Sequence, residues 1–413
     1  MIRQLQPIGR MRVGVIGAGT AGAAAAILLA RAGCTVSVLE RVVDPGPVGA
    51  GIMIQPTGQA VLARLGLLDT IAQRGARIDR LFLRAHTGRT LVDLRYAKVD
   101  RAWFGIGLHR GVLFEALYHA ARSESRVTVH TGAAIDGLAR AGTELTLRAG
   151  AIEYGPFDLV VVADGATSEL RGFAGKTKRD IGYPYGALWF VTEDRERVFK
   201  DELYQVGVRA RRLYGVLPTG LAPRGDAPVV SLFWSLGAHE LANWQRGGLD
   251  AWKAEVAAVD PRIKFVLDQI TSYQQVTFAT YRDVLMTHWH DRGVVFIGDA
   301  AHATSPQLGQ GANLALVDAL VLADAVAATT SIDRALDLYA RTRRVHLRYY
   351  QRMTRWLTPW FQSSSGMLGW LRDQIFPVAN AIAPLRNQMI ETMAGVSMGF
   401  VARPLKLPLA LKP

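Results

Sequence analysis

The sequence contains a single cysteine, Cys34, among its 413 residues. One cysteine cannot form a disulfide within its own chain, so a secreted scaffold held together by internal disulfides is excluded. Cys34 stands directly before an apolar stretch, and we expect its thiol to be buried there without a redox role. The absence of a disulfide framework fits a reducing compartment, and the protein is therefore expected to be cytoplasmic.

Long uninterrupted apolar runs are also missing. A membrane-spanning helix needs about 18 to 20 predominantly apolar residues in succession. The best late candidate, residues 367–385, is broken by Arg372, Asp373 and Pro377. Residues 1–12 lack the apolar core of a secretory signal. The sequence therefore predicts neither a spanning helix nor an exported protein.

Acidic residues are scarce at the C-terminal end. From Arg341 onward only Asp373 and Glu391 are acidic, and this part carries most of the excess behind the net charge of +13. Such a segment could attract anionic substrates or lie peripherally on an acidic membrane. The simpler interpretation, which we favour, is helices packed on the protein's own body. No nucleic-acid module accompanies the charge, so no nucleic-acid partner is expected. The basic residues of this part include Arg343, Arg344, Arg348, Arg352, Arg355, Arg372, Arg386, Arg403, Lys406 and Lys412.

Glycine, by contrast, is plentiful, and the first glycines form a nucleotide-binding motif. The turn 17–22, Gly-Ala-Gly-Thr-Ala-Gly, follows an apolar run and opens into an alanine-rich helix. Glycines permit the tight turn and let a pyrophosphate approach the helix N-terminus. The next strand, 35–39, ends at Glu40, the acid expected to bind ribose hydroxyls. This unit predicts a dinucleotide site.

A second signature lies far downstream at Gly298-Asp299. It follows the apolar run 294–297, so Asp299 stands at the carboxyl end of a parallel strand, where it can accept hydrogen bonds from a polyol such as a ribityl chain. The turn 309–313 then leads into a helix whose positive end would stabilise the negative charge of a reduced flavin ring. This signature narrows the cofactor from any dinucleotide to FAD.

The stretch between the two signatures predicts a separate sheet. Residues 182–281 are rich in aromatic and β-branched residues and in turns, which indicates an antiparallel substrate sheet. Strand-like patterns also occur at 81–84, 90–94 and in a hairpin over 143–154. The predicted fold class is mixed α/β. It comprises a discontinuous Rossmann-like FAD/NAD(P)-binding domain (1–181 and 282–345), an inserted antiparallel β-sheet substrate domain (182–281) and a C-terminal helical region (346–413).

Three motifs in this order resemble the flavoprotein aromatic hydroxylases, single-component FAD monooxygenases of the para-hydroxybenzoate hydroxylase type. They are the glycine turn 17–22, Asp164-Gly165 with Ser168 and Arg171, and Gly298-Asp299 with Pro306 and the turn 309–311. The resemblance covers residues 11–345. It implies that FAD lies in the split nucleotide domain and that the inserted sheet covers its ring and holds the substrate.

The resemblance also implies roles for individual residues. The glycine turn would contact the pyrophosphate, Glu40 and Arg41 the adenosine side, Arg110 the linking chain, and Asp299 the ribityl group. Asp164 would take part in FAD and NAD(P)H binding, although it could merely cap the next turn. The implied cofactor-binding set is Gly17, Gly19, Thr20, Ala21, Gly22, Glu40, Arg41, Arg110, Asp164, Asp299, Pro306, Gly309, Gln310, Gly311, Ala312 and Asn313.

No catalytic residue and no metal ligand is predicted. His302 belongs to the second flavin loop, and because no acid or nucleophile stands beside it in the sequence, we expect a structural role. Five aromatic residues are candidates for the substrate wall through their sheet context, although they could equally be core: Tyr183, Tyr185, Trp189, Tyr204 and Trp234.

The implied activity is an NAD(P)H-driven monooxygenation. NAD(P)H would reduce the flavin, dioxygen would add at C4a, and the hydroperoxide would insert one oxygen atom into an aromatic or other electron-rich small molecule, the other oxygen leaving as water. Alternatives with the same fold are a flavin-dependent epoxidase, halogenase or reductase, although the Trp-x-Trp-x-Ile-Pro signature of tryptophan-type halogenases is absent. A membrane-peripheral flavin-binding protein is a further alternative. The sequence does not decide whether the protein forms a homo-oligomer.

Overall fold

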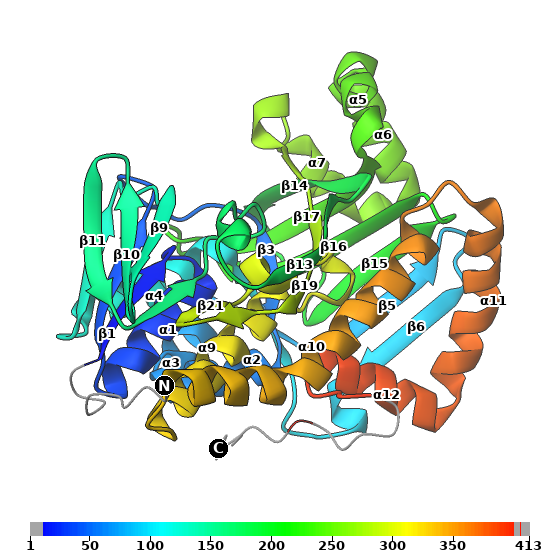
Figure 1. Cartoon of the computed structure of the whole chain (residues 1–413). Coiled ribbons are helices and arrows are strands. Elements are labelled where there is room, and N and C mark those ends of the chain that lie inside the picture. The colour runs from blue at the N-terminus through cyan, green and yellow to red at the C-terminus, as the bar shows by residue number, and fades with distance from the viewer. Residues whose placement is uncertain (1–10, 400–404, 406–413) are drawn as a thin grey trace.

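The computed structural model describes residues 11–399 and residue 405 (Figure 1). Arg403, Lys406 and Lys412, which belong to the predicted basic tail, lie outside the described residues. The architecture is mixed α/β, as predicted, with parallel and antiparallel sheets and a helical C-terminal part.

The central sheet has six strands in the order β20-β21-β12-β1-β2-β8, and all of its pairs are parallel except β20 with β21. Helix α1 is rich in alanine, and these small side chains allow it to be buried on most sides. It packs against α9 and α4. The thiol of Cys34, which directly follows that helical unit, is fully buried as expected, and burial raises its pKa to about 11. These elements are β1 (Arg12–Ile16), β2 (Thr35–Glu40), β8 (Val127–Thr131), β12 (Leu159–Val162), β20 (His290–Asp291), β21 (Val294–Phe296), α1 (Thr20–Arg31), α4 (Arg110–Ser123) and α9 (Gly311–Ala327).

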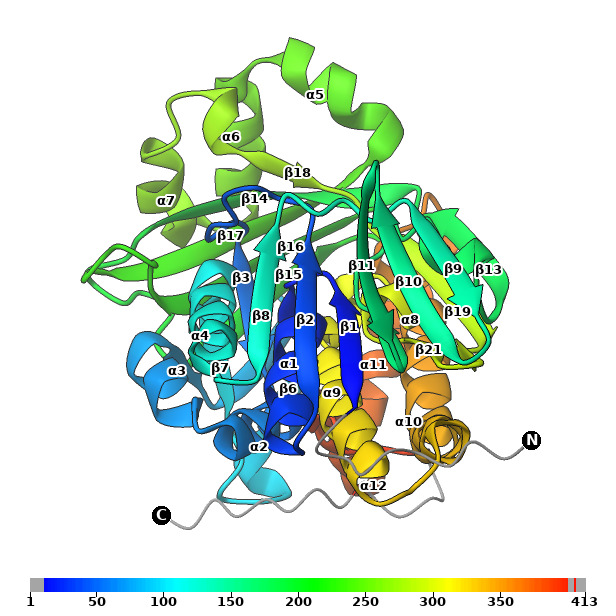
Figure 2. The same cartoon turned by 60° about the vertical axis from the view of Figure 1, so that its left-hand side comes forward.

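A three-stranded antiparallel sheet covers the other face of the parallel strands (Figure 2). Its apolar residues Leu145, Leu147 and Phe157 are buried against β1. Gly14 allows this close approach, because a methyl group there would lie 2.9 Å from the Phe157 ring. The predicted hairpin is confirmed and extended by one strand. The strands are β9 (Gly137–Ala141), β10 (Glu144–Ala149) and β11 (Ile152–Phe157).

The largest sheet has seven strands in the order β18-β14-β17-β16-β15-β5-β6. Its helices α5, α6 and α7 cover one face (Figure 1). The strands are β5 (Arg80–Ala85), β6 (Thr90–Arg95), β14 (Tyr185–Glu193), β15 (Glu202–Val208), β16 (Arg212–Leu221), β17 (Pro228–Gly237) and β18 (Thr277–Ala279), and the helices are α5 (Leu241–Gly247), α6 (Leu249–Val259) and α7 (Lys264–Asp268).

This sheet corrects the predicted domain composition at one point. Strands β5 and β6 lie within the range assigned to the nucleotide domain, yet β5 pairs with β15 of the large sheet. Alternation of apolar residues predicts a strand but does not say which sheet it joins, since pairing is decided by contacts between distant segments. The domain boundaries otherwise stay a prediction.

Two smaller β units join the nucleotide region to the large sheet. The ribbon of β13 (Lys176–Gly182) and β19 (Arg282–His288) carries the chain across in both directions, and β3 (Gly51–Ile54), β7 (Gly105–His109) and β4 (Ala76–Ile78) form a three-stranded sheet. That sheet packs so closely on β16 and β17 that its glycines at the contact could not carry a side chain. A methyl group at Gly107 would lie 1.9 Å from the Pro218 carbonyl oxygen, and one at Gly51 would lie 2.6 Å from Ser231 Oγ.

The C-terminal helices complete the structure. Helix α10 (Ile332–Phe361) crosses the predicted boundary at residue 345, and α11 (Gly366–Ala381) and α12 (Ala383–Ala394) follow it. Figure 1 shows α11 beside β5 and β6 at the edge of the large sheet. Within residues 11–399, no helix is both long enough and apolar enough to cross a membrane.

Candidate functional site

The sequence motifs meet at one edge of the parallel sheet. Strands β2, β1, β12 and β21 are neighbours and run in the same direction, so their carboxyl ends lie side by side. Those ends carry Glu40, the glycine turn, Asp164 and Gly298-Asp299. The turns touch: a methyl group at Gly17 would lie 2.6 Å from the Ala163 carbonyl oxygen, and one at Gly298 would lie 2.9 Å from Ala21 Cβ. Open α/β sheets bind ligands at this edge.

The glycine turn presents a helix N-terminus with free N–H groups. Gly17 has φ +96°, which favours glycine, and a methyl group at Gly22 would lie 1.9 Å from the Gly17 carbonyl oxygen. Gly19 precedes α1 without a side-chain cap, and a methyl group there would meet nothing within 4 Å. Thr20 and Ala21 begin the helix, so their N–H groups face this open space. An anion fits such an end of a helix.

Glu40 braces the same turn. Its Oε2 accepts the Ala18 N–H at 2.8 Å, and its Oε1 accepts the Val42 N–H at 2.9 Å. Each carboxylate oxygen keeps a further lone pair for a ribose hydroxyl. Its neighbour Arg41 is exposed. The predicted adenosine contacts of Glu40 and Arg41 stay predictions.

Asp164 is half-buried next to the turn, and one of its carboxylate oxygens is buried. Its Oδ1 has no hydrogen-bond partner among the described residues. Burial raises the pKa of this carboxyl group. A buried acceptor without a donor is costly, so the position is suited to a ligand that donates a hydrogen bond.

The second signature leaves a carboxylate free beside an open turn. Asp299 is exposed at the start of α8 (Asp299–His302). A methyl group at Gly311 would lie 3.9 Å from Asp299 Oδ1, and one at Gly309, which has φ +61°, would meet nothing within 4 Å. Pro306 starts the short helical turn before Gly309. The free carboxylates and the glycine-lined space fit the polyol and pyrophosphate of FAD.

The rest of the second loop is tied to the protein. Asn313 accepts the Gln55 N–H at 2.8 Å and donates to the Met53 carbonyl at 3.0 Å, while Gln310 Nε2 donates to the Met393 carbonyl at 2.7 Å. Their amide groups therefore position the loop against β3 and α12. The cofactor contacts predicted for Gln310, Ala312 and Asn313 would therefore be made by their backbone groups. These contacts stay predictions.

Arg110 lies at the other end of the site, at the start of α4. Its side chain passes Gly49, where a methyl group would lie 3.1 Å from Arg110 Cδ. Next to it, His109 Nδ1 accepts the Gly111 N–H and caps the helix, and burial lowers the pKa of this imidazole. A shallow cavity of about 480 Å³ opens between His109 and the turn 222–225. The contact of Arg110 with the linking chain stays a prediction.

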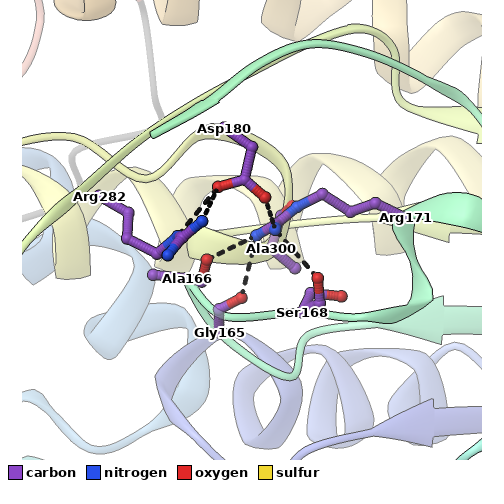
Figure 3. A network of polar contacts seen from close by, with 7 residues as sticks. All are labelled: Gly165, Ala166, Ser168, Arg171, Asp180, Arg282 and Ala300. Atoms are coloured by element: carbon purple, nitrogen blue, oxygen red, sulfur yellow. Dashed lines mark hydrogen bonds and ion pairs between the residues drawn. The ribbon is translucent and has the colours of Figure 1, made fainter. Parts of the chain in front are cut away.

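Arg171 clamps the Asp164-Gly165 turn to its surroundings (Figure 3). It donates to the carbonyls of Gly165, Ala166 and Ser168 at 3.3, 2.9 and 3.0 Å, and to the Ala300 carbonyl of α8 at 2.7 Å. Its remaining contact is with the carboxylate of Asp180 in the β13–β19 ribbon. Burial lowers the pKa of the guanidinium. One side chain thus joins two of the three motifs.

The ribbon completes the clamp through residues that the sequence analysis missed. Asp180 on β13 accepts Arg171 at 2.8 Å and Arg282 of β19 at 2.6 Å. Figure 3 shows Asp180 between the two guanidinium groups. Opposite charges on two segments some hundred residues apart gave no local signal, because the strand pairing that brings them together is tertiary.

A second missed residue, Asp318, holds the downstream motif from behind. Fully buried on α9, it accepts the Gly298 N–H at 2.9 Å, His302 Nε2 at 2.5 Å and Arg343 Nε at 2.7 Å. His302 is itself buried and pairs with this carboxylate, an acid partner that was not evident from the sequence, and its structural role stays a prediction. The only sequence signal was a carboxylate inside the apolar run 314–327.

The same buried network continues to the C-terminal part. Arg343 Nη1 donates to His346 Nδ1 at 2.6 Å, and His346 Nε2 donates to the Gly395 carbonyl at 2.7 Å. These partners assign the neutral imidazole with its proton on Nε2. Burial, and next the charge of Arg343, lower the pKa of His346 to about 3. Burial alone would raise the pKa of Asp318, but the charges of His302 and Arg343 outweigh it and lower that pKa.

We expect stability to fall as the pH drops below neutrality. In the unfolded chain His346 has a pKa near 6.5, so between about pH 6.5 and 3 the unfolded state binds a proton that the folded state excludes. The stabilisation is full above that window and is lost as the pH falls through it. The melting temperature should decline from pH 7 to pH 5, and His346→Gln should lower it at pH 7 but flatten this decline. An equal slope in both proteins would contradict the assignment.

The predicted wall aromatics fall into two groups. Tyr204 and Trp234 face α6 and lie with Trp252 in one apolar cluster, so they are core. Trp189 and Phe233 form a directly opposed pair on the other face of the sheet, with ring centroids 5.2 Å apart. Tyr185 shares the face of Trp189 by strand alternation.

The face of Trp189 and Phe233 is the one turned to the nucleotide region. Ser231 lies on it and contacts Gly51 of β3. Trp189 Nε1 donates to the Tyr281 hydroxyl at 3.1 Å, and the Tyr183 N–H donates to the Tyr281 carbonyl at 2.9 Å. The Tyr183 hydroxyl lies beside Ser305, next to Pro306, and burial raises its pKa. An aromatic wall therefore runs from the downstream loop onto the sheet, and Phe233 and Tyr281 extend the predicted set.

Comparisons with known proteins point in one direction. Residues 10–354 match the family described as "FAD binding domain". The chain is 29% identical over 350 residues to 6-methylpretetramide 4-monooxygenase of Streptomyces rimosus, with 80% of this chain and 79% of that protein covered. It is 27% identical over 346 residues to 3-hydroxybenzoate 6-hydroxylase of Klebsiella oxytoca, with 81% and 84% covered.

The fold is similar to solved structures as well. The Klebsiella pneumoniae HpxO structure with FAD and uric acid has a TM-score of 0.75 at 21% identity, covering 93% of this chain and 97% of that one. Pseudomonas aeruginosa PqsL with 2-aminobenzoylacetate has a TM-score of 0.76 at 22% identity, covering 88% and 99%. At these identities the likeness concerns the fold.

Proposed function

The chain belongs to the FAD-binding family of flavin-dependent monooxygenases, and on that premise we propose that it uses NAD(P)H and dioxygen to hydroxylate a small aromatic molecule. The observation that carries the proposal is the open, glycine-lined edge that holds the unpaired buried Oδ1 of Asp164 and the exposed carboxylate of Asp299 and is bordered by an aromatic wall. Bound FAD would supply the redox chemistry with NAD(P)H and dioxygen.

The residues at the strand ends would hold the cofactor. The free N–H groups at the start of α1 would bind the pyrophosphate, and Glu40 would bind ribose hydroxyls while it braces the turn. Asp299 would accept hydrogen bonds from the ribityl hydroxyls. The N-terminus of α9, which begins at Gly311, would stabilise negative charge on the ring. These contacts would hold the cofactor at the strand ends.

The aromatic wall would orient the substrate. Trp189 and Phe233 offer flat apolar surfaces for stacking on an aromatic ring. Tyr183 and Tyr281 add hydroxyl groups at the end of the wall nearest Ser305, and burial raises the pKa of both, so both stay protonated and can donate hydrogen bonds to a phenol or carboxylate oxygen of the substrate. The family relatives are named for aromatic substrates, which supports this substrate class.

Closure of the site would fall to the C-terminal helices. The end of α12 is tied to the downstream loop through the Gln310–Met393 bond, and Gly395 sits against Thr57, where a methyl group would lie 2.1 Å from Thr57 Oγ1. This packing would exclude water from the bound cofactor. Reducing equivalents would then not be lost as hydrogen peroxide. The alternatives of an epoxidase, halogenase or reductase have no observation in their favour.

The purified protein is expected to carry or take up FAD and to oxidise NADH or NADPH faster when a suitable phenol or other aromatic is present. The product should gain one oxygen atom, which mass spectrometry with isotope-labelled dioxygen would trace to the gas. The matched control is the same assay without the aromatic compound. A colourless protein that cannot take up FAD, or a product labelled from water, would contradict the proposal.

A further inference from the structure

Helix α11 is apolar on both its inner and its outer face. Its inner face is fully engaged: Arg372 is buried, donates to the Arg209 carbonyl at 2.6 Å and lies 5.3 Å from the centroid of the Phe361 ring. Phe376 packs on Trp360 and Phe361 with ring centroids 5.8 Å away. The helix is therefore firmly docked.

The opposite side of α11 carries large apolar side chains in solvent. Met367 is 66% exposed, Trp370 62% and Val378 57%, and Ile375 is exposed too. We call these four residues the α11 outer face. A helix that is apolar all round is normally covered on all sides, and a contiguous exposed apolar patch marks an interaction site. The exposed apolar side chains continue past the helix at Ile382 and Leu385.

Positive charge borders this face. Arg89 reaches onto it and donates to Gln374 at 3.0 Å, whereas the exposed Arg209 lies in the turn that contacts the buried Gly369 on the inner side of the helix. Arg386 follows on α12. None of the three arginines forms an ion pair with a carboxylate in the part of the chain that the structure describes. Asp373, an acid on the same helix, pairs with Arg372 at 2.7 Å.

We propose that the α11 outer face docks on an anionic lipid surface. Apolar and tryptophan side chains would enter the headgroup boundary, and the surrounding arginines would pair with lipid phosphates. A second copy of the chain is the other occupant of matching size. A two-fold contact through this face would bring two faces of the same positive charge together, so charge favours the lipid. The attachment is peripheral and leaves the proposed flavin site in place.

The holoenzyme is expected to co-sediment with vesicles of phosphatidylcholine and phosphatidylglycerol and much less with phosphatidylcholine alone, and high salt should release it. A triple variant, Met367→Gln, Trp370→Gln and Val378→Gln, should lower the bound fraction by roughly tenfold. Arg89→Gln with Arg386→Gln should abolish the preference for the anionic lipid. The matched control is Ile152→Gln, an exposed apolar residue on β11 (58% exposed), which should change nothing.

Several results would overturn the proposal. Vesicle binding that the triple variant leaves unchanged would place the contact elsewhere, and no binding to either vesicle would exclude it. A dimer seen by light scattering that the triple variant dissociates would show that a second copy covers the face. Because the variants lie outside the flavin site, FAD content and NAD(P)H oxidation should match the unaltered protein, so failure of the proposed activity would be seen separately.

Discussion

Replacing Asp299 with alanine is expected to weaken FAD binding by about 10- to 100-fold. The carboxylate is exposed at the strand end and faces the Gly311 turn, where it would accept hydrogen bonds from ribityl hydroxyls. A hydrogen bond to a charged group contributes about 1.5–3 kcal/mol, and each 1.4 kcal/mol is about tenfold in affinity. The measurement is a fluorescence titration of the apoprotein with FAD.

Two further variants make this test specific. Asp299→Asn keeps an acceptor without the charge and should give an intermediate loss. Asp291→Ala removes a half-exposed carboxylate, paired with Arg292, at the edge strand of the same sheet and should leave FAD affinity unchanged. Because the side chain of Asp299 has no recorded partner among the described residues, its replacement should not lower the melting temperature. An unaltered FAD affinity in Asp299→Ala would reject the ribityl role.

The parallel-sheet motifs were predictable because each is local. A glycine turn, the acid after the next strand and the Gly298-Asp299 pair all stand directly after apolar runs, and strand ends of one parallel sheet must share an edge. Their convergence followed from strand direction alone. The hairpin at 144–157 was predictable for the same reason.

What escaped prediction depends on pairing between distant segments. Strand β5 joins the large sheet through β15, more than a hundred residues away, and the same kind of pairing brings Asp180 to Arg282. Strand alternation could have sorted the wall aromatics only once the register was known: Leu188 opposes Trp234 on the core face, and Trp189 opposes Phe233 on the other. The sequence showed which residues were aromatic but not which face of the sheet was turned to the nucleotide region.

Asp318 is the clearest case of a residue whose importance appears only in three dimensions. Its side chain and that of Arg343 are 0% and 1% exposed, and they pair at 2.7 Å behind the downstream motif. Their separation of 25 residues, on two different helices, carries no local pattern. The pair binds α9 to α10 and, through Gly298 and His302, fixes the strand end that presents Asp299.

Asp318→Ala is expected to lower the free energy of unfolding by about 3–5 kcal/mol, because it leaves the Arg343 guanidinium buried without a counter-ion. The measurement is urea unfolding of the apoprotein near pH 7, so that lost cofactor does not contribute. Asp268→Ala breaks an exposed pair with Lys264 and should cost no more than about 0.5 kcal/mol.

A double variant separates the unpaired charge from the loss of packing. Removing both charges, as in Asp318→Leu with Arg343→Met, should recover much of the lost stability, since the cost lies in the lone buried cation rather than in the missing attraction. The recovery should be incomplete, because the Gly298 N–H and His302 also lose their acceptor. A single variant that costs less than about 1 kcal/mol, or a double variant no more stable than Asp318→Ala, would show that water reaches Arg343 and that the network does not hold the strand end.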